Sequence, residues 1–147
     1  MTPEAALTLA EAWAKHARSN LDKLEFSPDG SFHGDVGSAY LQYEAVAGGL
    51  AARGLVGQEG TRLLKHPQLF ERLKAAGEQQ KSRTAGGYFE VDVGAAEFGR
   101  DPTVNLRLDF EDGGMKASDF VDAVQELMDA STYWRLQGYL DVLVPPG

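Results

Sequence analysis

Residues 104–134, VNLRLDFEDGGMKASDFVDAVQELMDASTYW, decide the fold class, because a strand pattern changes into a helix pattern within them. Over residues 104–110 apolar and polar side chains alternate, which is typical of a strand with one buried face. From Phe120 to Trp134 apolar residues recur every three or four positions, and Ser118 and Asp119 stand where a helix cap is needed. The sequence therefore predicts a half-buried strand followed by an amphipathic helix.

Two tight turns in the first half of the chain predict two antiparallel hairpins. Ser27-Pro28-Asp29-Gly30 is a turn sequence, because proline presets the turn and glycine accepts the positive φ that closes it. Gly48-Gly49 offers a second turn, between a strand over residues 39–46 and a strand over residues 50–56. Arg53 lies in the middle of the latter run, which predicts either an edge strand or a strand packed closely against a neighbour.

Two more helices and a third hairpin complete the predicted order. Thr2 and Pro3 provide a hydroxyl cap and a proline at the first helical position, so a helix should begin there and end near residues 19–20. Residues 60–81 have helical spacing that is interrupted by Pro67, which can start a helix but cannot donate inside one, so we expect a short turn and then a helix from Pro67. Residues 88–93 alternate and are joined to the strand at Val104 by a loop of hairpin length.

The composition fits one globular domain. The chain has 147 residues, of which 43% are hydrophobic, so it can build one core. We predict an α+β domain over residues 1–147, an antiparallel sheet with helices in the order α-β-β-β-β-α-β-β-α, with residues 138–147 as a candidate extended tail. No apolar run approaches the roughly 18 residues of a membrane helix, and the N-terminus has no leader pattern, so we expect a cytoplasmic protein.

The charge of the chain limits its partners. Asp and Glu number 22 against 14 Lys and Arg, for a formal net charge of -8, which argues against binding to nucleic acid or to an anionic membrane. Residues 109–129 hold seven acids and only one base, Lys116. This segment is either a docking face for a basic partner or an ordinary solvated helix face.

The sequence contains no recognisable catalytic or metal-binding motif. Cysteine is absent, and His16, His33 and His66 stand in separate elements without ligand spacing, so we expect no metal and no cofactor. Residues 109–114 begin like a calcium loop, but Phe120 stands where the loop needs its glutamate. No phosphate loop and no nucleophile elbow is present, so we expect no enzyme activity.

Several short motifs follow one another along the chain from about residue 4 to residue 136. They are an N-terminal amphipathic helix leading into Leu24-x-Phe26-x-x-Asp29-Gly30, Leu41-x-Tyr43 with Leu50, Leu69-Phe70-x-x-Leu73, Thr84-x-Gly86-Gly87-Tyr88-Phe89, Leu106-x-Leu108 and Tyr133-Trp134-Arg135. In this order they resemble the Tir chaperone (class I) family of type III secretion chaperones. The stretch between residues 56 and 67 and the loop over residues 94–102 fit the pattern loosely.

The resemblance implies a non-catalytic homodimeric chaperone that binds the N-terminal segment of a secreted effector and keeps it competent for export. It implies an effector-binding groove that includes Trp13, Leu24, Phe26, Phe32, Leu41 and Tyr43. It also implies a dimer interface that includes Leu69, Phe70, Leu73, Tyr88 and Phe89. The same side chains are needed for the core, so we expect at most half of the groove residues to be exposed.

Two other functions are consistent with the sequence. The first alternative is an acidic immunity or antitoxin protein that blocks a folded basic toxin by charge complementarity and needs no apolar groove. The second is a small-molecule enzyme with two carboxylates in a pocket, which nothing in the sequence singles out.

Overall fold

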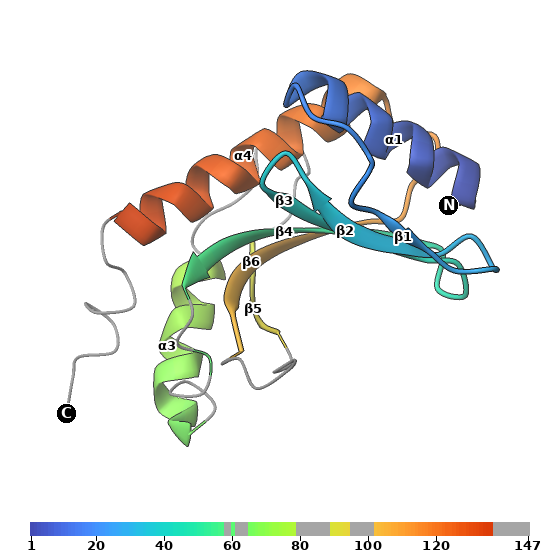
Figure 1. The fold of residues 1–147 in the computed structure, drawn as a ribbon. Helices are drawn as coiled ribbons and strands as arrows, with labels where there is room; N and C mark the ends of the chain where they lie inside the picture. The colour runs from blue at the N-terminus through green and yellow to red at the C-terminus, as the bar shows by residue number, and fades with distance from the viewer. Residues whose placement is uncertain (58–59, 61–64, 79–88, 95–101, 137–147) are drawn as a thin grey trace.

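The computed structural model describes residues 1–57, 60, 65–78, 89–94 and 102–136, and it confirms the predicted α+β class and element order (Figure 1). The helices described are α1 (Pro3–His16), α3 (Pro67–Glu78) and α4 (Ala117–Leu136). The strands are β1 (Glu25–Phe26), β2 (Phe32–Val36), β3 (Ala39–Glu44), β4 (Gly49–Gly57), β5 (Glu90–Val93) and β6 (Val104–Phe110). The predicted glycine break at residues 86–87, Tyr88 and the tail over residues 138–147 lie outside the described residues.

The strands form one six-stranded antiparallel sheet in the order β1-β2-β3-β4-β6-β5. The three predicted hairpins are confirmed as β1 with β2, β3 with β4, and β5 with β6. β4 also pairs with β6, from Leu50 opposite Phe110 to Gly57 opposite Val104. β4 is therefore a central strand, so of the two alternatives for the strand around Arg53 the edge strand is wrong.

The helices share one buried core with one face of the sheet. Figure 1 shows α1 and α4 side by side across this face, and α3 packs against β5. Alternate strand residues point into the core, among them Phe32, Leu41 and Leu106, which are 0–2% exposed. Trp13 of α1 and Trp134 of α4 are buried in the same cluster, as their helical spacing predicts.

α1 begins as predicted and ends earlier than predicted. The Thr2 hydroxyl accepts a hydrogen bond from the Ala5 N–H at 3.2 Å, and Pro3 occupies the first turn. The helix ends at His16, because Arg18 takes a positive φ of 53° and the Ser19 N–H then bonds back to the Ala14 carbonyl at 2.8 Å. The chain therefore leaves the helix before residues 19–20.

α4 begins one residue before the predicted cap. The Phe120 N–H donates to the Lys116 carbonyl at 3.1 Å, which places Ser118 inside the first helical turn. Asp119 lies in the same turn, where its negative charge is favourable near the positive end of the helix dipole. The difference shifts the start of the helix and leaves the buried face of α4 as predicted.

The close packing that the small residues of β4 suggested occurs at Gly54. A Cβ atom at this position would lie 2.1 Å from Oγ and 2.8 Å from Cβ of Ser131 in α4. Ser131 is 1% exposed, and its hydroxyl donates to the Leu127 carbonyl at 2.7 Å. Gly54 therefore allows α4 to lie directly on the centre of the sheet.

Candidate functional site

The structure places the predicted groove residues in two environments. Five of the six are at most 8% exposed and belong to the core: Trp13, Leu24, Phe32, Leu41 and Tyr43. Phe26 is 59% exposed, although it is a large hydrophobic side chain. Only Phe26 of this set can therefore meet a partner without a rearrangement of the core.

Phe26 is the outer end of a row of aromatic rings. Its ring centroid lies 5.7 Å from that of Phe32, and the Phe32 centroid lies 5.6 Å from that of Tyr43. Phe26 pairs directly with Phe32 across β1 and β2, so both rings are on the face of the sheet that the helices cover. The row extends this apolar face beyond the buried core to the edge of the sheet.

The main chain of Phe26 also faces outward. The Ser27 N–H donates to the Ser31 carbonyl at 2.8 Å, and Gly30 closes the turn between them with a φ of +92°. Hydrogen-bonded and non-hydrogen-bonded pairs alternate along an antiparallel ladder, so the next pair, Phe26 with Phe32, is a non-hydrogen-bonded one. The N–H and C=O of Phe26 therefore point away from β2, on the side of β1 where the described part of the chain places no strand.

Glu25 points to the opposite face of the sheet. Its carboxylate Oε2 lies 3.4 Å from Nε2 of His33, the residue directly opposite on β2. His33 Nδ1 lies 3.1 Å from the Tyr40 hydroxyl of β3, so His33 connects the edge strand to the third strand. The side chains of Glu25 and His33 remain 79% and 47% exposed, which keeps this pair weak.

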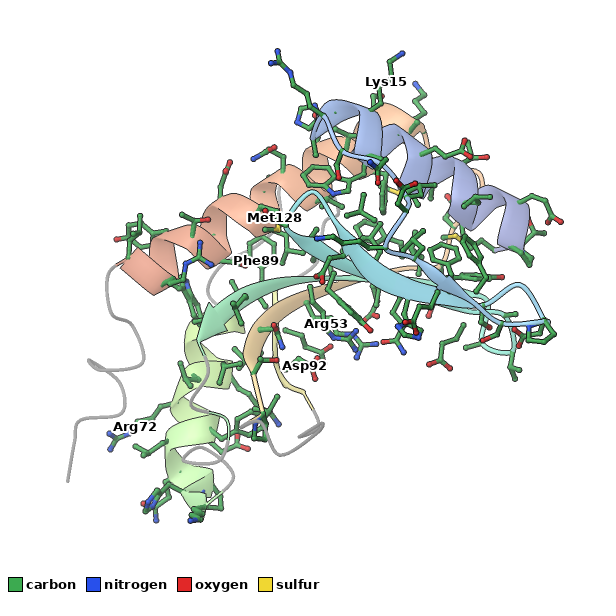
Figure 2. The ribbon with its side chains drawn as sticks, viewed as in Figure 1. Lys15, Arg53, Arg72, Phe89, Asp92 and Met128 are labelled. Atoms are coloured by element: carbon green, nitrogen blue, oxygen red, sulfur yellow. The ribbon has the colours of Figure 1, made fainter. Side chains whose placement is uncertain are left out.

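A stronger polar cluster lies at the centre of that same face. Arg53 donates from Nε to Oδ2 of Asp92 at 2.6 Å and from Nη1 to Oε1 of Gln42 at 2.7 Å. Figure 2 shows Arg53 and Asp92 next to each other on the side of the sheet away from α1 and α4. The contact reaches from β4 across β6 to β5, and therefore holds the last strand against the centre of the sheet.

Arg107 lies directly opposite Arg53 on β6, where two like charges would repel each other. Burial disfavours the charged form of Arg107, but the hydrogen bond and charge of Asp109, with the charges of Asp92 and Glu90, raise its pKa above the ordinary value. Arg107 donates to Oδ1 of Asp109 at 2.8 Å. The neighbouring acids thus offset the repulsion between the two arginines, and the cluster stabilises the pairing of the strands in the sheet.

The predicted dimer residues lie where α3 meets β5. Leu73 and Phe89 are at most 4% exposed, and Leu69 and Phe70 are partly buried against the core. β5 is the second edge of the sheet within the described residues. Three of the four residues therefore lie on α3, which packs against the edge strand β5, and Phe89 directly precedes that strand.

The three histidines lie in different parts of the fold, and one acid of the acidic segment is engaged by an arginine of the same strand. His16 hydrogen-bonds to Gln125 at 3.1 Å, whereas His33 lies on β2 and His66 precedes α3. Asp109, the first acid of the calcium-like stretch, is bound to Arg107. Over the described ranges no three His, Asp or Glu side chains are placed to hold a metal ion, and no helix is long and apolar enough to cross a membrane.

Sequence reasoning missed the polar side chains on the face of the sheet away from α1 and α4. Glu25, Arg53, Asp92 and Arg107 were visible only as the polar partners of an alternating pattern. That pattern shows which side chains share a face of one strand, but it does not show which strands are neighbours. The Arg53–Asp92 contact depends on the pairing of β4 with β6, which joins segments far apart in the chain.

Comparisons with known proteins give one similar structure. No family model matches the chain, and no curated protein matches it. A chain in the crystal structure of the ExsC–ExsE complex is 12% identical, with a TM-score of 0.47, over 89% of this chain and 93% of that chain. A similarity at this level does not assign the protein to a family.

Tyr43 makes the stability of the folded state depend on pH in the alkaline range. Its hydroxyl donates to the Met1 carbonyl at 2.8 Å, and burial raises its pKa, with a further contribution from the charges of Glu4 and Asp29. The folded state therefore favours the neutral phenol. Stability from this preference is complete below the pKa of an unfolded tyrosine, about 10, and is lost as the pH rises through the higher folded value.

We expect Tyr43→Phe to lower the free energy of unfolding by about 1 kcal/mol at pH 7, because the hydrogen bond to Met1 is lost. As the pH rises to strongly alkaline values, the free energy of unfolding of this variant should fall less than that of the unmodified protein. Urea unfolding at a series of pH values from neutral to strongly alkaline measures both effects. Tyr133→Phe, at an exposed tyrosine of α4, is the control for the loss of a hydroxyl. If Tyr43→Phe and the unmodified protein lose stability in parallel above pH 10, this account of Tyr43 is wrong.

Proposed function

We propose that the protein is a non-catalytic cytoplasmic chaperone that binds the N-terminal segment of a secreted effector and keeps it competent for export. The observation that carries the proposal is Phe26, an exposed aromatic side chain on the edge strand β1, whose outer side has no neighbouring strand among the described residues. Its outward N–H and C=O can hydrogen-bond to an added strand, while its ring contacts an apolar side chain of that strand. Strand addition of this kind uses main-chain bonds for affinity and side-chain pockets for selection.

We propose further that the chaperone is a homodimer. A two-fold interface needs a self-complementary apolar patch, and the contact of α3 with β5 supplies Leu69 and Phe70 beside a strand edge. The effector strand and the second copy would then use opposite edges of the same sheet. Light scattering of the purified protein should give twice the chain mass, and a monomer across the micromolar range would contradict this part of the proposal.

Export provides the test of the chaperone function. Deletion of the gene should remove one or a few proteins from the culture medium, and the intact gene should restore them. Phe26→Asp should fail to restore export, because a charge replaces the apolar contact at the edge strand. Val46→Asp is the matched control, since Val46 is 97% exposed in the turn between β3 and β4 and is not part of the edge strand.

Each result of this experiment has a defined meaning. Both variants must be as soluble and as stable to urea as the unmodified protein for the comparison to hold. Unchanged secretion after deletion would overturn the proposal. Restoration by Phe26→Asp would show that the effector does not use this edge, and binding of a folded basic protein by a monomer would support the immunity-type alternative.

A further inference from the structure

The edge strand β1 presents two different chemistries on the two faces of the sheet. Phe26 is exposed on the face that the helices cover, and Glu25 is exposed on the other face. Successive residues of any strand point to opposite faces. A segment added beside β1 therefore places one side chain next to Phe26 and its sequence neighbours next to Glu25.

The charge around this edge is negative. Asp22, Glu25 and Asp29 are exposed within residues 22–29, against the single base Lys23. The Asp29 carboxylate accepts a hydrogen bond from the Ser31 N–H at 2.9 Å, and this contact lowers its pKa, so it stays ionised. Opposite charges on neighbouring strands stabilise their pairing, and like charges weaken it.

We propose that the β1 edge selects an extended segment in which apolar and basic side chains alternate, with the apolar side chain on Phe26 and the basic side chain beside Glu25. The inference rests on the proposed strand addition and specifies the chemistry of the partner segment. It also assigns Glu25 a role in selecting the partner segment, which is separate from its weak pair with His33. An acidic segment with the same apolar residues is excluded by charge, because it would set like charges against Glu25.

Synthetic peptides test this selection without a known effector. Two peptides of about eight residues are sufficient, because a strand is usually five or six residues long. One alternates valine with lysine, the other alternates valine with glutamate, and terminal prolines limit self-association. At low salt we expect the lysine peptide to bind about fivefold more tightly or better, since cross-strand charge pairs have effects of this order.

Glu25→Lys should reverse the preference, so that the glutamate peptide binds more tightly. Asp122→Lys is the matched control, because it changes the net charge equally at an exposed position of α4, away from the edge strand. A third peptide that alternates serine with lysine should bind weakly, since it lacks the contact with Phe26. Together these variants separate local selection at β1 from attraction to the acidic protein as a whole.

Several results would overturn the proposal. They are equal affinity for the lysine and glutamate peptides, an equal effect of Glu25→Lys and Asp122→Lys, and no binding of any peptide. Failure of the proposed function can be told apart from failure of this inference. If Phe26→Asp abolishes export but the peptides show no charge preference, the chaperone function stands and the charge selection is wrong. If the lysine peptide is preferred but deletion of the gene leaves export unchanged, the charge selection stands and the chaperone function is wrong.

Discussion

Truncation of Trp13 to alanine is expected to lower the free energy of unfolding by about 3–5 kcal/mol. Trp13 is 2% exposed, and its Nε1 donates to the Val36 carbonyl at 2.7 Å. The substitution leaves a cavity between α1 and the sheet and removes the donor of a buried carbonyl, so two costs add. Because small domains are stable by only about 5–15 kcal/mol, this loss is a large part of the total stability.

Urea unfolding followed by far-ultraviolet circular dichroism measures this effect without relying on tryptophan fluorescence. Trp13→Phe keeps most of the apolar volume and loses the donor, so we expect a loss of about 1–2 kcal/mol. Glu11→Ala, at an exposed position of α1, should change stability by less than about 0.5 kcal/mol. A loss below about 1 kcal/mol for Trp13→Ala would show that α1 is not anchored through this side chain.

Gly54→Ala is expected to destabilise the protein by about 1–3 kcal/mol, although it adds a single methyl group. The new Cβ would lie 2.8 Å from Cβ of Ser131, and a Cβ cannot move away without its backbone. Either α4 lifts from the sheet or β4 bends, and both changes weaken the core between them. The matched control is Gly49→Ala, because the nearest atom to its added Cβ is the Phe110 carbonyl oxygen at 4.0 Å.

A double substitution shows whether the contact with Ser131 causes this loss. Ser131→Gly alone should lower the free energy of unfolding by about 1 kcal/mol, because glycine has a lower helix propensity than serine. It also removes both atoms that meet the new methyl group, so Gly54→Ala with Ser131→Gly should be more stable than the sum of the single effects predicts. Additive effects of the two substitutions would place the cause elsewhere in β4.

The local elements of this protein follow from short-range patterns in its sequence. The turn at Asp29-Gly30 and the cap at Thr2 are satisfied by neighbouring residues, so the sequence could locate them without the rest of the chain. The cap of α4 was misplaced by two residues, because Ser118 is a good cap residue but the first helical bond is accepted by the carbonyl of Lys116. Helix ends depend on such small differences between adjacent residues.

The candidate site was less predictable than the fold. Phe26 and Phe32 are both aromatic residues at the ends of one turn, and the sequence offered no reason to treat them differently. In the structure Phe32 is 2% exposed and Phe26 is 59% exposed, because one lies in a strand paired on both sides and the other in the edge strand. The resemblance to a chaperone family nominated both residues without separating them.

The sequence by itself determined which segments are helices and strands and which side of each is apolar, because these properties depend on spacing along the chain. Only the tertiary structure decided how the three predicted hairpins pair with one another and what covers each apolar side. The pairing of β4 with β6 placed Arg53 beside Asp92, and the helices covered Tyr43 but not Phe26. Such contacts join distant segments whose burial is settled only when the whole core packs.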